Sequence, residues 1–217
     1  MVSTPSGRLT KAAQNRFRRL GFFGVIAAIL TGCASSPPEN PDNICSIFKE
    51  KRSWYRASRD AQYKWGTPKS LQLAIIRQES AFDADAKPSR RRFLFVFPGK
   101  RRSTARGFPQ AIEQTWETYI RATGNRGADR DSFRDAADFV AWYARETSSR
   151  NGVARTDAYR QYLAYHEGWG GYARGSYQGK PTLQAAARRV ASTASRYEAQ
   201  LRGCEKVKKN GKTKFKG

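Results

Sequence analysis

The sequence is poor in metal-binding residues and in long apolar stretches. Its 217 residues include one histidine and three cysteines, which do not supply a usual zinc ligand set. It also has no glycine-rich phosphate-binding loop. We therefore expect neither a metal nor another cofactor. The apolar run at residues 20–30 is shorter than the roughly 20 residues that a transmembrane helix needs.

Acidic residues are scarce as well, since 18 Asp and Glu stand against 41 Lys and Arg and give a formal net charge of +23. Such a charge indicates a polyanionic partner, whether nucleic acid, anionic lipid or cell-wall polymer. Hydrophobic residues make up 39% of the chain and include five Trp, ten Tyr and twelve Phe. This content is enough for a folded core, and the length limits the protein to one domain or two small ones.

Residues 1–32 have the pattern of an export signal, because five basic residues and no acidic residue precede the apolar run at 20–30. The run leads into the string LTGC, which ends at Cys33 and resembles the lipobox of bacterial lipoproteins. The resemblance implies that Cys33 carries a lipid that anchors the protein in a membrane. Because Ala34 follows the cysteine, it also implies anchoring in the outer membrane, facing the periplasm. An ordinary secretory signal is the alternative.

Export bears on the charge and on the two other cysteines. Removing residues 1–32, with their five basic residues, lowers the formal net charge from +23 to +18, so the exported part is itself basic. Export also separates it from nucleic acid, and we expect no nucleic-acid partner. Because an exported protein meets an oxidising environment, we expect a disulfide between Cys45 and Cys204, with two free thiols as the alternative.

The composition divides the exported part into three segments. Residues 33–43 are rich in Ser, Pro, Asn and Asp, which is typical of a solvated tether between lipid and domain. Residues 44–204 carry repeated helical patterns and predict a mainly α domain. Residues 205–217 contain six lysines and are predicted to be disordered, either as a contact to anionic envelope surfaces or as a solvated tail.

Helix starts within residues 44–204 are marked by prolines and by capping residues. The expected signals are Thr67 with Pro68, Pro109, Ser132 with Asp135, Thr156, and Pro181. In the last helix, apolar residues recur at helical spacing, namely Leu183, Val190, Tyr197 and Leu201. The apolar residues 93–97 lie between basic clusters and predict a small loop or hairpin excursion; a basic and aromatic lip that contacts lipid or substrate is the alternative.

Glu79 has the sequence setting of a general acid. It ends an apolar helical pattern, with Ile75 four and Ile76 three positions earlier on the same face. Such a carboxyl is desolvated and faces the negative end of the helix dipole, and both effects raise its pKa. A raised pKa keeps an acid protonated near neutral pH. The alternative is a structural Glu that pairs with an arginine.

Three short motifs occur in order along the domain. They are the pair Glu79 and Ser80, the string GFPQ at residues 107–110, and the string AYHEG at residues 164–168. Together they resemble the Glu-Ser, Gly-Leu-Met-Gln and Ala-Tyr-Asn-x-Gly motifs of lytic transglycosylases with a soluble-lytic-transglycosylase, goose-lysozyme-like catalytic domain. The resemblance spans roughly residues 44–201 and implies a lysozyme-like helical fold, with the excursion at 93–97 beside its cleft.

The resemblance also implies what the matching residues do. Glu79 is the single catalytic acid/base that cleaves the β-1,4 bond between N-acetylmuramic acid and N-acetylglucosamine in peptidoglycan glycan strands, leaving 1,6-anhydro-muramyl ends. Tyr165 positions the Glu79 carboxyl, and Gly107 lets the backbone approach the substrate closely. The implied substrate-binding residues are Ser80, Gly107, Gln110 and His166.

The sequence departs from the family motifs at three positions. Phe108 and Pro109 replace Leu and Met, and His166 stands where the family has Asn, so the contacts around the acid differ. The imidazole of His166 can donate one hydrogen bond as an amide does, and a structural histidine is the alternative. Trp169 lies among glycines, where we expect the helix to have ended, and it is therefore a candidate for stacking on a sugar.

Two other functions stay open. A hydrolytic goose-type lysozyme needs a second carboxylate, and Asp83 or Asp85 would supply it if the polar string after Glu79 folded into the cleft. A catalytically idle peptidoglycan-binding lipoprotein would keep the cleft and use the basic surface alone. The intact Glu79 favours the enzyme.

Overall fold

The computed structural model describes residues 1, 36–88, 90–93, 97–101, 103–208 and 211–216, and in 90–93 and 97–101 it describes the backbone alone. It separates the chain into the units Met1–Ala34 and Ser35–Gly217. The predicted signal segment after Met1 lies outside the described residues, as does Cys33. Within the described part of the chain, no helix is both long and apolar enough to cross a membrane.

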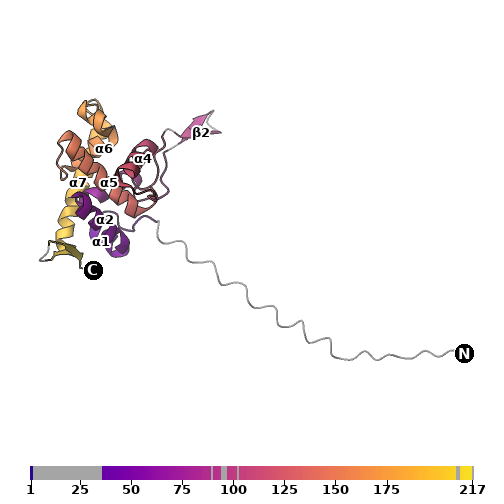
Figure 1. Ribbon diagram of the computed structural model, residues 1–217, viewed down its shortest axis with the longest axis horizontal. Coiled ribbons are helices and arrows are strands. Elements are labelled where there is room, and N and C mark those ends of the chain that lie inside the picture. The colour runs from indigo at the N-terminus through magenta and orange to yellow at the C-terminus, as the bar shows by residue number, and fades with distance from the viewer. Residues whose placement is uncertain (2–35, 89, 94–96, 102, 209–210, 217) are drawn as a thin grey trace. The chain divides into compact units, whose positions relative to one another are not determined.

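Helices dominate the unit Ser35–Gly217 (Figure 1). Its described helices are α1 (Ile44–Glu50), α2 (Arg52–Trp65), α3 (Lys69–Ser80), α4 (Glu113–Thr123), α5 (Phe133–Asn151), α6 (Ala158–Ala173) and α7 (Pro181–Cys204). Two small antiparallel sheets accompany them, which pair β1 (Arg90–Phe93) with β2 (Phe97–Arg101) and β3 (Glu205–Val207) with β4 (Thr213–Phe215). The prediction of a mainly α domain is confirmed.

Helix α5 lies at the centre of the packing. It packs against α2, α3, α4 and α6, while α7 packs against α1, α3 and α6. Trp54 of α2 stacks on Phe133 of α5 with ring centroids 3.9 Å apart, and Phe108 meets both rings edge-on. Because burying a large apolar side chain contributes roughly 1.5–3 kcal/mol, this cluster fixes α2, α5 and the loop around Phe108 relative to one another.

The predicted start signals are confirmed for α5 and α7. The Ser132 side chain caps α5 by accepting a hydrogen bond from the Asp135 amide, and Pro181 is the first residue of α7. The four apolar residues that the spacing of α7 predicts to share a face are all buried, namely Leu183, Val190, Tyr197 and Leu201. Local capping and periodicity therefore define the two longest helices.

Two threonines that were expected to cap helices do not do so. The Thr67 hydroxyl donates to the Ala141 carbonyl at 2.9 Å, which ties the start of α3 to the middle of α5. At the start of α6, the side chain of Asp157 accepts the hydrogen bond from the Arg160 amide, so Asp157 replaces Thr156 as the cap. In the first case a tertiary hydrogen bond wins over the local one, and in the second the neighbouring residue is the stronger cap.

The residues just before α1 are folded against the domain, which corrects the prediction of a solvated tether up to residue 43. The Pro41 carbonyl accepts hydrogen bonds from Arg77 and Tyr197. The Asn43 side chain caps α1 by accepting from the Ser46 amide. Pro and Asn in this segment therefore serve as a hydrogen-bond acceptor and a helix cap, a use that composition alone does not distinguish from a linker.

The prediction that residues 205–217 are disordered is wrong for the part that the structure describes. Strands β3 and β4 form a hairpin, and Phe215 is 8% exposed, with its ring against Phe48 and Tyr55. The amide of Lys216 donates to the Cys204 carbonyl. The lysines dominate the composition of this segment, but the buried Phe215 and hydrogen bonds from Thr213 and Lys216 hold it on the domain.

The backbone of β1 and β2 pairs Arg92 with Pro98 and Phe93 with Phe97, which agrees with a hairpin excursion. Residues 94–96 lie outside the described residues, and so do the side chains of both strands. The lip that contacts lipid or substrate therefore stays a prediction. Ser103 and Ala105, shortly after β2, line a cavity that is described below.

A disulfide joins Cys45 of α1 to Cys204 at the end of α7, across a sequence separation of 159 residues. It ties the first helix of the domain to the last one. A cross-link over so long a loop removes much of the freedom of the unfolded chain, which in the chain-entropy model stabilises the fold by about 4–5 kcal/mol.

We expect Cys45→Ser combined with Cys204→Ser to lower the free energy of unfolding by about 2–5 kcal/mol without changing the fold. Urea denaturation with and without reductant measures this difference, and reduced wild-type protein serves as the control because it should match the variant. Equal midpoints of variant and wild type in the absence of reductant would contradict the prediction.

Candidate active site

Glu79 lies at the C-terminal end of α3, one residue before the helix ends. The next two residues, Ala81 and Phe82, both have positive φ, at 51° and 65°. This conformation is uncommon for residues other than glycine. It turns the chain sharply and puts the Phe82 ring, fully buried, against Trp54. The burial of Phe82 offsets the cost of the turn and fixes the position of the helix end that carries Glu79.

The Glu79 carboxyl is poorly solvated. Burial raises its pKa to about 7, and the Tyr162 hydroxyl, which donates a hydrogen bond to it, opposes part of that rise. Burial favours the neutral acid because a charge is costly to desolvate, whereas the donor favours the carboxylate. A carboxyl with a pKa near 7 is populated in both protonation states at neutral pH. Glu79 can therefore donate a proton and later accept one.

The hydroxyl that contacts Glu79 belongs to Tyr162, not to Tyr165. Both residues lie on the same face of α6, three positions apart, but the Tyr165 hydroxyl donates to the Pro109 carbonyl at 2.5 Å. Tyr165 is nevertheless near enough for the charge of Glu79 to act on it, and burial together with that charge raises the pKa of Tyr165. The prediction that Tyr165 holds the carboxyl is therefore corrected, and Tyr165 holds the loop opposite.

A cavity of about 410 Å³ opens in front of Glu79. It brings together several residues that the sequence motifs single out, namely Glu79, Gln110, Tyr165 and His166. Ser80, Gly107 and Trp169 are not among its lining residues. Among the described residues, no group of three or more His, Cys, Asp or Glu side chains could hold a metal ion.

The second motif shapes the loop that faces Glu79. Gly107 has φ of 71°, and a Cβ at this position would lie 2.2 Å from the Arg130 carbonyl oxygen, so the glycine serves a close approach within the protein and not to substrate. Gln110 has φ of 46°, which is why α4 begins at Glu113 and not at Pro109. The loop therefore contains two residues in the left-handed backbone conformation, Gly107 and Gln110, before α4 begins.

The side chain of Gln110 is used largely inside the loop. Its amide nitrogen donates to the carbonyls of Ala86 and Gly107, at 2.8 and 2.9 Å. The amide oxygen is the part of Gln110 that is left for a ligand. The Phe108 ring is almost fully buried against Trp54, which explains why an apolar residue larger than leucine fits at this motif position.

Two further predicted substrate contacts, those of Ser80 and Trp169, are wrong. The Ser80 hydroxyl is buried and donates to the Ile76 carbonyl one turn earlier in α3. Trp169 stacks on Tyr143 with centroids 4.7 Å apart, and the Arg150 guanidinium lies 4.3 Å from the centre of the Trp169 ring. These contacts occupy the ring, and α6 continues through Trp169 after a kink at Gly168, so the residue is a packing element.

Glu167, which the sequence analysis did not single out, also lines the cavity. Burial alone would raise its pKa, but hydrogen bonds from Lys180, Ser176 and His166 outweigh burial and lower the pKa to about 2. The carboxylate is thus charged at neutral pH and holds His166 by its Nδ1 atom at 3.1 Å. The exposed part of the imidazole faces the cavity, which fits a ligand contact at the family's Asn position.

The two aspartates after Glu79 stay outside this arrangement. Asp83 and Asp85 are both exposed, and Asp83 accepts a hydrogen bond from the Asp85 amide within the turn. Neither of them lines the cavity. In the described part of the chain, the carboxyls of the cavity wall are those of Glu79 and Glu167.

The model of the transglycosylase SLT domain family matches residues 21–204. The chain belongs to this family. A comparison with curated proteins gave no match, and a comparison with solved structures gave none either. The resemblance drawn from the three motifs is thereby confirmed at the level of the family, together with the lysozyme-like SLT fold. The SLT domain implies lytic transglycosylase activity on peptidoglycan.

Tyr162 and not Tyr165 donates to the Glu79 carboxyl. We therefore expect that, of the two, only Tyr162→Phe shifts the alkaline limb of the pH–activity profile to higher pH. Loss of a donor that favours the carboxylate raises the pKa of Glu79, so activity should persist to higher pH. The measurement is kcat/KM on peptidoglycan between pH 5 and 9. Tyr165→Phe is the control, and a limb that moves with Tyr165→Phe but stays in place with Tyr162→Phe would refute the assignment.

Proposed function

We propose that this SLT domain protein cleaves the β-1,4 bond between N-acetylmuramic acid and N-acetylglucosamine without water, using Glu79 as its single acid/base. The observation that carries the proposal is the poorly solvated Glu79 carboxyl with a pKa of about 7 in the wall of the cavity. Because general acid catalysis is most efficient when the acid has a pKa near the working pH, this carboxyl suits the reaction at neutral pH.

In the first step, the protonated Glu79 carboxyl gives its proton to the glycosidic oxygen. The bond between this oxygen and the anomeric carbon of the muramyl residue breaks, and positive charge develops on that sugar. In the second step, the 6-hydroxyl oxygen of the same sugar bonds to the anomeric carbon and its proton passes to the Glu79 carboxylate. The products are a free 4-hydroxyl and a 1,6-anhydro-muramyl end, and Glu79 is protonated again.

The second carboxylate of the cavity does not suit a hydrolytic mechanism. An inverting enzyme needs a carboxylate that takes a proton from water, and a retaining one needs a carboxylate that is free to attack the sugar. Glu167, with a pKa of about 2, is a weak base, and its oxygens accept hydrogen bonds from Ser176 and Lys180. This supports the transglycosylase over the goose-type lysozyme. The idle wall-binding protein is disfavoured because it has no use for a buried acid.

The site of action is a further part of the proposal. The lipobox-like LTGC string supports a lipid on Cys33, and Ala34 after it supports the outer membrane with the domain facing the periplasm. The basic surface of the exported part would then draw it to the anionic cell wall. Labelling with a radioactive fatty acid tests the lipid, with Cys33→Ala as the variant that should remain unlabelled.

Digestion of purified peptidoglycan, followed by mass spectrometry of the released fragments, tests the reaction. We expect anhydro-ended fragments, one water lighter than hydrolysed ones, and a loss of at least about 10²–10⁴-fold in rate with Glu79→Gln. Asp83→Asn is the matched control because it removes an exposed carboxyl just after the same helix. Reducing ends would indicate a lysozyme, and a folded protein that binds the wall without cleaving it would indicate the idle binder.

A further inference from the structure

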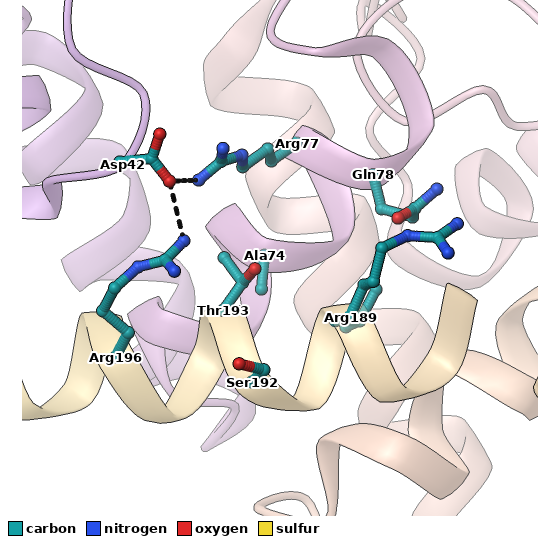
Figure 2. Close-up of a pocket in the computed structure, with 9 residues that line it drawn as sticks. Asp42, Ala74, Arg77, Gln78, Arg189, Ser192, Thr193 and Arg196 are labelled. Carbon is teal, nitrogen blue, oxygen red and sulfur yellow. Dashed lines mark hydrogen bonds and ion pairs between the residues drawn. The ribbon is translucent and has the colours of Figure 1, made fainter. Parts of the chain in front are cut away.

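A second cavity, of about 370 Å³, lies between α3 and α7 and shares no lining residue with the first. Figure 2 shows Arg77 and Gln78 projecting into it from α3, opposite Arg189 and Arg196 of α7. The segment before α1 adds Asp42. The wall therefore contains three arginines and one acidic residue, which leaves an excess of positive charge.

The charges in this cavity are unevenly paired. Asp42 accepts hydrogen bonds from Arg77 at 2.8 Å and from Arg196 at 2.9 Å. Within the described part of the chain, no hydrogen bond or ion pair is formed by Arg189, and none by the side chain of Gln78. In Figure 2 the side chains of Arg189 and Gln78 lie close together, away from Asp42. The pairing of Asp42 with two arginines shows how this wall receives a carboxylate, and Arg189 with Gln78 offers donors for another.

The cavity borders the catalytic residue. Gln78 directly precedes Glu79 in α3. The charge of Arg189 also reaches the Tyr162 hydroxyl, where it opposes the rise in pKa that burial causes. Tyr162 in turn donates to Glu79. Arg189 therefore lies within electrostatic range of the reacting centre, although it lines a different cavity.

The substrate of the proposed function carries carboxylates at a suitable distance. Each peptide stem of peptidoglycan branches from the muramyl residue, which is the sugar whose bond is cut, and contains free carboxylates. An extended peptide covers about 3.3–3.6 Å per residue, and a helix with its side chains is about 10–12 Å wide. Three or four extended stem residues thus cover a length equal to the width of a helix such as α3, in which Glu79 lines the active-site cavity and Gln78 lines the second one.

We propose that the cavity between α3 and α7 binds a carboxylate of the peptide stem through Arg189 and Gln78, so that the enzyme prefers stem-bearing glycan strands. This inference rests on the proposed function. An arginine pairs well with a carboxylate because its donors form a planar fork. A doubly charged phosphate fits less well, since the carboxylate of Asp42 already lies in the wall.

The test compares two substrates: glycan strands with peptide stems, and the same strands after an amidase has removed the stems. We expect the wild type to have the higher kcat/KM on stem-bearing strands, and Arg189→Ala to reduce the ratio of the two values by about 5–20-fold. Arg188→Ala is the matched control, since Arg188 is an exposed neighbour in α7 that does not line the cavity. Its ratio should equal that of the wild type.

Three outcomes would overturn the inference while leaving the proposed function intact: no preference in the wild type, an equal effect of Arg189→Ala on both substrates, or an equal change of the ratio by Arg188→Ala.

If neither substrate is cleaved, the proposed function fails. Calorimetry with a free stem tetrapeptide then decides the inference, which requires binding by the wild type and weaker binding by Arg189→Ala. Displacement of this peptide by an equal concentration of inorganic phosphate would reduce the cavity to a general anion site and contradict the proposal.

Discussion

The burial of one carboxyl at the end of α3 is the constraint on which the rest of the site depends. A poorly solvated carboxyl stays protonated to higher pH, and this raises the pKa of Glu79 to about 7. Helices α5 and α7 pack on α3, and the buried Phe82 fixes the turn that follows it. The fold thus holds the Glu79 carboxyl in surroundings that disfavour its charged form.

The two carboxyls of the cavity, those of Glu79 and Glu167, have very different pKa values. Glu79 receives one phenol donor and is largely neutral below pH 7, whereas Glu167 receives hydrogen bonds from Lys180 and Ser176 and stays charged. Two titratable groups with pKa values pushed apart are typical of a site with an acid and a fixed charge. In this protein the fixed charge orients His166 and ties α6 to the start of α7, whereas Glu79 is the carboxyl of the cavity wall whose pKa lies near neutral pH.

The sequence was informative for several features that depend on neighbouring residues. Helical patterns and start signals predicted helices in the regions of α3 to α7, Ser132 predicted the start of α5, and the apolar run before Glu79 predicted a desolvated acid. It failed where distant segments decide. Tyr162 and Tyr165 share a face of α6, and the loop at Pro109 selects which of them reaches Glu79. Two partners of Glu167, Ser176 and Lys180, lie 9 and 13 residues further on, beyond the end of its helix, at a spacing that no periodic pattern encodes.

The most direct test of the account is the protonation of Glu79 itself. Carbon-13 NMR of the side-chain carboxyls, recorded from pH 3 to 9, follows each titration, and the signal that is missing in Glu79→Gln identifies the residue. The account predicts a midpoint near pH 7, because burial penalises the charged form. A midpoint near 4.5, the ordinary value for a solvated glutamate, would contradict it and would leave the enzyme without an acid at neutral pH.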